Sequence, residues 1–289
     1  MTHAGPPTHA LTATQAEKLD TLRRVVSGYE RVVVALSGGV DSALVAAVAA
    51  ERLGAGALAV TAQSPSLPAA ELQAADDLSA RIGIQHRVVR TDEMARPAYV
   101  ANQGDRCYHC KTELYSHLTP IAAELGAVVC NGTNLDDLGD YRPGLRAARE
   151  REIRSPLVEA GCGKADVRAL ARHLGLPVWD KPAAACLASR VPVGTPVSVP
   201  VLGEIEAAEA LLHSLGVSHV RVRHHGEIAR IETDAAGIEI VARERETVER
   251  RLRALGFRFV TLDLGGYRSG SLNPIATHPS GAAQPIEES

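Results

Sequence analysis

Aromatic side chains are scarce in this sequence and make up only 3% of its 289 residues. A buried core must therefore be built mainly from alanine, valine and leucine, within a chain that is 45% apolar. No run approaches the roughly 18 consecutive apolar residues of a membrane-spanning helix, so we expect no membrane partner. The net charge is only -3, which argues against a nucleic-acid partner held by bulk electrostatics.

A secretion signal and a disulfide framework are also missing. Residues 1–13 carry neither a basic region nor an apolar run, and we interpret them as a disordered leader. Residues 271–289 are rich in Pro, Ala, Gly and Glu and are predicted to form a disordered tail. An odd number of cysteines in a long chain favours thiols in a reducing cytoplasm. These cysteines are Cys107, Cys110, Cys130, Cys162 and Cys186.

Strand and helix patterns alternate over residues 14–190, which we predict to be one domain. Apolar periodicity predicts helices at 14–29, 41–53, 69–82 and 110–125, and short apolar runs predict strands at 31–36, 57–61, 86–90 and 127–130. This alternation predicts a doubly wound, Rossmann-like α/β fold with a parallel sheet.

A proline-bearing stretch, residues 191–200, predicts a hinge between this domain and a smaller one. Residues 191–270 are predicted to form a small α+β domain that binds substrate or mediates assembly. Its predicted helices are 202–215 and 243–255, and its predicted strands are 217–223, 227–232 and 257–264.

A glycine-rich turn follows the first predicted strand, and its residues are Ser37, Gly38, Gly39, Val40, Asp41 and Ser42. Two glycines let the backbone approach a polyanion, and the next helix offers its N–H groups and dipole to phosphate. We expect Asp41 at the cap of that helix, where it could also hold Mg²⁺. The lysine of a Walker A loop is absent, which excludes the kinase and GTPase type of phosphate loop.

In this strand–turn–helix context the six residues resemble the PP-loop signature SGGxDS of the adenine-nucleotide alpha hydrolases. The resemblance implies ATP cleavage between the α and β phosphates and transfer of AMP to a substrate oxygen. Ligands of open α/β sheets bind beyond the carboxyl ends of the strands. The residues there that we expect to contact adenine and ribose are Thr61, Gln63, Gly132 and Asn134. Asp137 and Asp140 are predicted to bind Mg²⁺, the alternative being a solvated acidic loop.

Three further motifs narrow the family: RCYHCK (106–111), NGTNLDDLGDYRPG (131–144) and CLASRVPVGTPV (186–197). With the glycine-rich turn they resemble the LarE family of ATP-dependent sacrificial sulfur transferases, over residues 15–265. The resemblance implies a small nucleotide substrate, pyridinium-3,5-biscarboxylic acid mononucleotide, a precursor of the nickel-pincer nucleotide cofactor. Each carboxylate is adenylated and then converted to a thiocarboxylate. The resemblance also implies a homo-oligomer, either a trimer or a trimer-based hexamer.

By the same resemblance Cys186 is the catalytic nucleophile, which loses its sulfur and remains as dehydroalanine. A nearby Arg190 is expected to lower the pKa of this thiol. Cys107 and Cys110 form a CxxC pair, and two cysteines cannot close a zinc site alone. With Cys186 they could instead hold a [4Fe–4S] cluster whose open iron carries exogenous sulfide. A sacrificial Cys186 with a structural CxxC, and a persulfide relay, are the alternatives.

Paired arginines alternate on a predicted strand of the small domain. Arg221 and Arg223 project from one face of VRVRHH, and Glu209 lies on the preceding helix. Two guanidinium groups make a fork for a phosphate monoester, as the implied substrate requires. A solvated strand face is the alternative.

Other readings of the glycine-rich turn predict different properties. A tRNA-thiolating enzyme would carry a basic surface or an added RNA domain. An amide-forming enzyme, such as NAD or GMP synthetase, would not depend on Cys186. A nucleotide sensor of the universal stress type would release no pyrophosphate with the dicarboxylate.

Overall fold

The computed structural model describes residues 9–139, 143–182 and 185–268. Residues 1–8 of the predicted leader, the predicted tail and Asp140 lie outside these residues. Residues 9–13 of the predicted leader are described: Thr12 caps a helix that begins at Ala13, and Leu11 packs against the core, so this part is not disordered. The described chain divides into two compact units, which are considered separately. Unit 1 holds the residues up to Ala188 together with Gly194–Glu206, and unit 2 holds Ser189–Val193 and the residues from Ala207 onward.

A four-stranded parallel sheet forms the centre of unit 1, which confirms the predicted α/β fold. Its strands are β1 (Val32–Ala35), β2 (Ala57–Gln63), β3 (Gln85–Arg90) and β4 (Val128–Cys130), in the order β3-β2-β1-β4. The order reverses between β1 and β4, where the chain returns to the far side of β1. A crevice is expected at such a reversal, beyond the carboxyl ends of the two strands.

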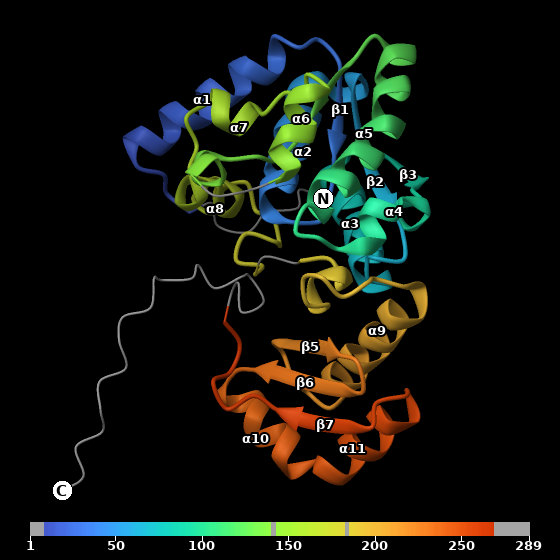
Figure 1. Ribbon diagram of the computed structural model, residues 1–289. Helices are drawn as coiled ribbons and strands as arrows, with labels where there is room; N and C mark the ends of the chain where they lie inside the picture. Colours follow the sequence, from blue (N-terminus) through green and yellow to red (C-terminus); the bar gives the residue numbers. More distant parts are fainter. Residues whose placement is uncertain (1–8, 140–142, 183–184, 269–289) are drawn as a thin grey trace, which may run out of the picture. The chain divides into compact units, whose positions relative to one another are not determined.

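Helices cover both faces of this sheet (Figure 1). The side chains of Val32 and Val34 pack in one core, and those of Val33 and Ala35 pack in the other, because alternate residues of a strand point to opposite faces. The first core includes residues of α1 (Ala13–Ser27), α2 (Val40–Leu53), α3 (Ala69–Ile82), α7 (Pro156–Glu159) and α8 (Lys164–His173). The second includes residues of α5 (Arg106–Leu125) and α6 (Pro143–Glu150).

The structure adds short elements that the periodicity did not predict, namely α4 (Pro97–Ala101), α6, α7, α8 and the 3-10 turns η1 (Gly54–Gly56), η2 (Glu93–Ala95), η3 (Leu135–Gly139) and η4 (Leu187–Arg190). It also starts α5 at Arg106, four residues before the predicted start at Cys110. Cys107 and Cys110 therefore both lie near the start of α5, three residues apart and on one face.

Unit 2 is a three-stranded sheet packed against helices (Figure 1). Strands β5 (Val220–His225), β6 (Ile228–Thr233) and β7 (Phe259–Leu262) lie in that order; β5 and β6 are antiparallel, and β6 and β7 are parallel. The helices are the part of α9 (Val199–Ser214) from Ala207 onward, α10 (Ala235–Arg243) and α11 (Arg245–Ala254). Leu212, Val222, Ile231 and Leu252 form part of a core common to the sheet and the helices.

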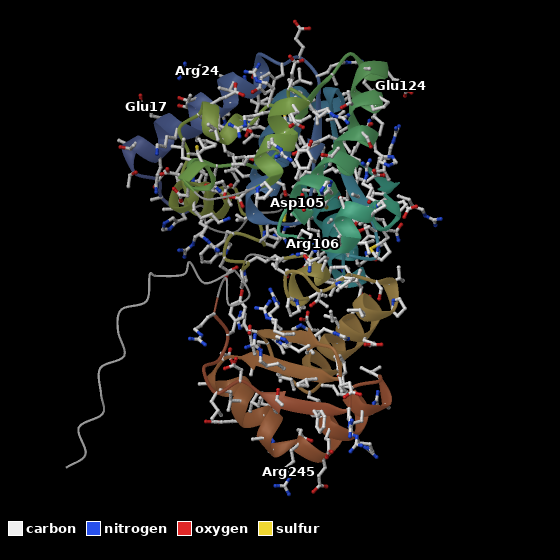
Figure 2. The ribbon with its side chains drawn as sticks, in the orientation of Figure 1. Glu17, Arg24, Asp105, Arg106, Glu124 and Arg245 are labelled. Carbon is white, nitrogen blue, oxygen red and sulfur yellow. The ribbon has the colours of Figure 1, made fainter. Side chains whose placement is uncertain are left out.

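Charged side chains such as Glu17, Arg24, Glu124 and Arg245 project outward from the helices that carry them (Figure 2). Within the described ranges, no helix is both long enough and apolar enough to cross a membrane.

Glu113 of α5 makes a contribution to the stability of the fold that depends on pH. Burial alone would raise the pKa of this carboxyl, but hydrogen bonds from Arg96 and His117 outweigh burial and lower the pKa below its ordinary 4.5. We predict that Glu113→Gln lowers the free energy of unfolding at pH 7 by about 2 kcal/mol, as expected for hydrogen bonds to a charged group. Denaturant unfolding measures this difference.

The sign of the pH effect follows from the lowered pKa. The stabilisation by Glu113 is present above the unfolded-state pKa and is lost as pH falls through the folded-state pKa. The variant and the wild type should therefore converge in acid. Glu124→Gln, an exposed site on the same helix, is the control and should leave stability unchanged. A difference in unfolding free energy between Glu113→Gln and the wild type that stays constant down to the lowest pH would contradict this account.

Candidate active site

The glycine-rich turn after β1 is built around the Ser42 hydroxyl. This hydroxyl donates to the Gly39 carbonyl at 3.1 Å, accepts from the Ser37 amide at 3.2 Å and lies 3.1 Å from the Ser37 hydroxyl. Gly38 has φ +74°, in the left-handed region that glycine occupies without strain. Ser42 thus fixes the turn from inside, while the exposed Ser37 hydroxyl is available to a ligand.

Asp41 does not cap the following helix, in contrast to the expectation from sequence. The N-cap of α2 is Gly39, and Asp41 is the second residue of the helix. Its carboxylate instead accepts a hydrogen bond from Asn134 Nδ2 at 3.0 Å and pairs with Lys164 Nζ at 2.5 Å. Asp41 therefore joins the glycine-rich turn to the loop after β4 and to the start of α8.

Backbone contact brings the loops after β1 and β4 together. A Cβ at Gly132 would lie only 2.6 Å from the Ser42 amide nitrogen, so the position requires glycine. Asn134 is buried, and its side-chain Oδ1 accepts a hydrogen bond from the Asp136 backbone amide at 3.0 Å. The backbone amide of Asn134 donates to Asp137 Oδ2 at 3.0 Å. Gly132 and Asn134 thus shape the wall of the crevice beside the phosphate loop.

Two lysines lie at this loop although the Walker A lysine is absent. Lys164, the first residue of α8, pairs with Asp41, and its amide donates to Asp136 Oδ2 at 2.8 Å. Lys181 Nζ lies 3.3 Å from the Gly38 carbonyl and 2.6 Å from Glu71 Oε2. The sequence analysis assigned neither lysine, because nothing local marks a residue more than a hundred positions from the loop that it contacts.

Thr61 and Gln63, at the carboxyl end of β2, differ in exposure. The Thr61 side chain is buried, donates to the Leu36 carbonyl at 2.9 Å and contacts His86 Nε2 at 2.9 Å. It therefore supports the turn from behind. Gln63 is exposed at the end of the strand, where its side chain can meet a ligand.

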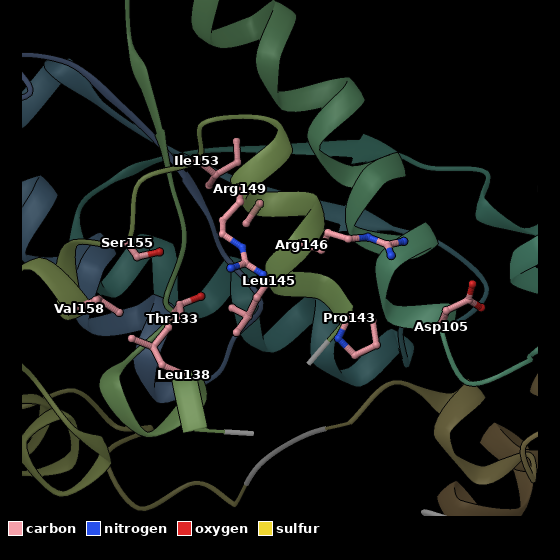
Figure 3. Close-up of a pocket in the computed structure, with 11 residues that line it drawn as sticks. Asp105, Thr133, Leu138, Pro143, Leu145, Arg146, Arg149, Ile153, Ser155 and Val158 are labelled. Atoms are coloured by element: carbon pink, nitrogen blue, oxygen red, sulfur yellow. The ribbon is translucent and has the colours of Figure 1, made fainter. Parts of the chain in front are cut away.

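A cavity of about 610 Å³ opens beside the loop after β4. Thr133 and Ser155 contribute hydroxyl groups, and Arg149 contributes a cation. In Figure 3 the Arg149 side chain runs toward Leu145 and Thr133. Arg146 points elsewhere, with its guanidinium 3.8 Å from the centre of the Tyr108 ring. The volume falls within the range of small-molecule sites.

Three thiols share one electrostatic environment in unit 1. Cys107 is exposed, and Cys110 and Cys186 are half-buried. Burial raises the pKa of Cys110 to about 12, and charges on Cys186 and Cys107 act in the same direction. Among the described residues no three Cys, His, Asp or Glu side chains stand in a metal-binding arrangement. The thiols are therefore neighbours whose sulfur atoms have not converged on a metal position.

Lys111 is the cation beside these thiols that the sequence analysis left without a role. Burial acts to lower the pKa of this ammonium, but charges on Tyr115, Cys110, Cys107 and Cys186 outweigh burial, and the pKa is raised. Lys111 therefore stays protonated at neutral pH and favours thiolate at its neighbours.

Cys130 and Cys162 are buried in the first core of unit 1 and are separate from these three thiols.

Arginine and carboxylate side chains form buried pairs in unit 2. Arg190 donates twice to Glu209, through Nε and one terminal nitrogen, both at 2.9 Å. Arg223 donates to Glu232 Oε2 at 2.9 and 2.7 Å. Arg221 lies over the Tyr267 ring at 5.5 Å, and burial, followed by the charge of Arg190, lowers its pKa. Arg190, Glu209 and Arg223 thus already have internal partners of opposite charge.

Comparison with known proteins adds the family to this geometry. Residues 17–102 match the asparagine synthase family, which identifies the phosphate loop and its sheet as those of a PP-loop enzyme. An uncharacterized protein of Synechocystis sp. is 47% identical over 90% of this chain and 98% of its own length. The pyridinium-3,5-bisthiocarboxylic acid mononucleotide synthase of Lactiplantibacillus plantarum is 42% identical over 92% of this chain and 97% of its own length.

Similarity to another PP-loop enzyme is partial. The tRNA-specific 2-thiouridylase MnmA of Azorhizobium caulinodans is 34% identical over 53% of this chain and 49% of its own length. Fold, phosphate loop and full-length similarity together define an ATP-using PP-loop enzyme. Within that class, the chain belongs to the LarE family of ATP-dependent sulfurtransferases.

The contact between Gly132 and Ser42 yields a sharp test. We predict that Gly132→Ala displaces the phosphate loop, because the added Cβ would meet backbone atoms that no side-chain rotation can move. The expected loss is about 1–3 kcal/mol of unfolding free energy, together with weakened ATP binding, measured by thermal unfolding and titration calorimetry.

Gly139→Ala is the matched control, because a Cβ there would meet nothing within 4 Å. Wild-type ATP affinity in Gly132→Ala would contradict the proposed role of this contact.

Proposed function

We propose that this enzyme uses ATP to convert pyridinium-3,5-biscarboxylic acid mononucleotide into its bisthiocarboxylic form, a precursor of the nickel-pincer nucleotide cofactor. One observation carries the proposal. A chain 42% identical to a synthase of that product, over nearly its full length, also places a PP-loop and three neighbouring thiols in one unit. The remaining steps follow from the chemistry that these groups can perform.

The phosphate loop carries out the activation step in this proposal. A free carboxylate is a poor electrophile, so its oxygen attacks the α-phosphorus of ATP and displaces pyrophosphate. The resulting acyl-adenylate has AMP as a good leaving group. The Ser37 hydroxyl and the N-terminus of α2 bind phosphate oxygens, and Lys164 and Lys181 neutralise the departing pyrophosphate. Magnesium enters with ATP, and Asp41 with Asp137 would hold it through oxygen donors.

The three thiols supply sulfur to the activated carbonyl. Attack of a sulfur nucleophile on the acyl carbon forms the C–S bond and releases AMP. Lys111 provides a positive charge beside these thiols. Cys186 is the nucleophile in the sacrificial form of this reaction: its Sγ forms a thioester, and loss of the Cα proton with cleavage of the Cβ–Sγ bond then leaves the thiocarboxylate product and dehydroalanine at position 186.

We further propose that Cys107, Cys110 and Cys186 hold a [4Fe–4S] cluster. Three thiolates within mutual electrostatic reach, with Lys111 to balance their charge, match a cluster with three protein ligands. The sulfur atoms would have to move together to bind it, since they do not form a ready site. When bound, such a cluster supplies an open iron that carries exogenous sulfide.

Substrate phosphate recognition falls to Arg221 in this proposal, with the enzyme acting as a homo-oligomer. Arg223 and Glu209 hold its surroundings in place through their buried ion pairs. Burial, followed by the charge of Arg190, lowers the pKa of Arg221, and a bound phosphate dianion would stabilise its charged form.

The fate of Cys186 distinguishes the two sulfur sources. With ATP, the dicarboxylate nucleotide and sulfide, we predict AMP, pyrophosphate and thiocarboxylate, with the mass of the Cys186 peptide unchanged. Cys186→Ser should abolish thiocarboxylate formation, whereas Cys162→Ala should retain it. Intact and peptide mass spectrometry after turnover provide the measurement. A mass loss of one H₂S at Cys186 would assign the sulfur to that residue itself, and ADP in place of AMP would exclude adenylation.

Iron analysis tests the cluster separately. Anaerobically purified enzyme should contain about four irons and four labile sulfides per chain. Cys110→Ser should contain none, and Cys162→Ala should match the wild type. Iron-free wild-type enzyme would reject the cluster while leaving the adenylation step intact.

A further inference from the structure

The segment 188–193, which follows Cys186 and Leu187, is flanked by residues that α4 and its neighbours hold through hydrogen bonds. This involves four residues, Ser66, Tyr99, Val100 and Asn102, which we call the α4 clamp. None of the four belongs to the phosphate loop or to the three thiols. Their hydrogen bonds lie on either side of the segment 188–193, directly after the nucleophile.

On the N-terminal side of residues 188–193, Ser66 of the clamp contacts Leu187, the residue after Cys186. The Leu187 amide donates to the Ser66 carbonyl at 2.9 Å. The Ser66 hydroxyl lies 2.5 Å from the Tyr99 hydroxyl, and both side chains are buried, at 3% and 1% exposure. A buried hydroxyl pair is costly to separate, because each group would lose its partner without gaining water. Tyr99 therefore fixes Ser66, and Ser66 fixes the backbone beside the nucleophile.

On the far side, the clamp holds the GTPV stretch of the motif. The Gly194 amide donates to the Asn102 carbonyl at 2.8 Å, and Asn102 Nδ2 donates to the Thr195 carbonyl at 3.0 Å. The Val197 amide donates to the Val100 carbonyl at 2.9 Å. Asn102 has φ +54°, a conformation that asparagine tolerates better than most residues. This explains a motif, VPVGTPV, that the proposed chemistry leaves without a role.

Tyr99 also belongs to the electrostatic environment of the thiols. Burial raises the pKa of its hydroxyl, and charges on Cys186 and Cys110 raise it further. The phenol therefore stays neutral beside these thiols and acts as a hydrogen-bonding group, not as a base.

We propose that the buried Ser66–Tyr99 hydroxyl pair is a positioning element for Cys186, which holds the thiol at a fixed place relative to Cys107 and Cys110 without touching the substrate. The inference deepens the proposed function, because the reaction of a sulfur nucleophile depends steeply on its position. Loss of either hydroxyl should loosen the segment at Leu187 while the fold of unit 1 persists.

The test uses full-length Tyr99→Phe and Ser66→Ala. Alkylation of Cys186 by iodoacetamide, followed anaerobically by peptide mass spectrometry without ATP or acceptor, should accelerate by a factor of about three to ten through local opening. In turnover, kcat for thiocarboxylate formation should fall by a factor of about ten, while the KM for ATP stays at the wild-type value. The buried Cys130 and Cys162 serve as internal standards and should remain protected if the fold is intact.

Tyr29→Phe is the matched control, since the Tyr29 hydroxyl also donates one hydrogen bond, to Glu159 at 2.8 Å, away from the thiols. Tyr29→Phe should change neither the rate of Cys186 alkylation nor kcat for thiocarboxylate formation. Wild-type Cys186 alkylation and kcat in both clamp variants would overturn the proposal. The alkylation arm needs no substrate, so it judges the clamp even where the wild-type enzyme fails to act on the dicarboxylate nucleotide, an outcome that would reject only the proposed function.

Discussion

The backbone of Gly132 lies against the amide of Ser42, and the geometry of the phosphate loop depends on this contact. Strands β1 and β4 are paired in register, with Val34 opposite Cys130, so the loops that follow them leave the sheet at the same level. The two loops can approach this closely only because position 132 presents no Cβ. The hydrogen bond between Asn134 and Asp41 then closes the gap between them. One missing side chain thus permits a network that polar residues alone could not assemble.

The ion pairs of the two units differ in the energy needed to break them. The Lys164–Asp41 and Lys181–Glu71 pairs are partly exposed, with side-chain exposures of 22–35%, so their net stabilisation is about 1 kcal/mol or less. A polyphosphate can therefore take over either lysine at little cost. The Arg223–Glu232 pair is almost fully buried, at 7% and 1% exposure, and removing one partner would cost about 3–5 kcal/mol. The lysines of unit 1 are thus suited to exchange partners, and this pair of unit 2 is suited to stay fixed.

The order of strands and helices in unit 1 could be predicted because buried β-branched runs and glycine stops are local signals. The start of α5 was misplaced because its first turn, RCYH, has no apolar periodicity. That turn is held in place by contacts such as the hydrogen bond between Arg106 and Asn102. Helix α10 was missed although Asp234 marks its start by accepting the Gly237 amide at 2.8 Å. A capping residue alone, before a short helix, was not enough to predict it.

The site was less predictable than the fold because its partners are distant in sequence. The glycine-rich turn identified the phosphate loop, but Lys164 lies 123 residues from Asp41, and Lys181 lies 143 residues from Gly38. Alternation placed Arg221 and Arg223 on one face of a strand, yet it could not reveal that Glu232, across the β5–β6 pairing, takes Arg223 as its partner. Local patterns indicate which groups are available, and the tertiary fold decides which of them are already paired.

Cys186 lies in a loop, but hydrogen bonds hold the residues that follow it in place. The segment 189–193 that follows it is counted with unit 2, where Arg223 donates to the Ser189 carbonyl at 3.1 Å and Arg190 is held by Glu209. The residues on either side of that segment are held by unit 1 through Leu187 and Gly194. A thiol on a free loop would sample many positions, and the entropy of fixing each residue is about 1–2 kcal/mol. Because these hydrogen bonds supply that fixation in advance, the backbone beside Cys186 is held before any ligand binds.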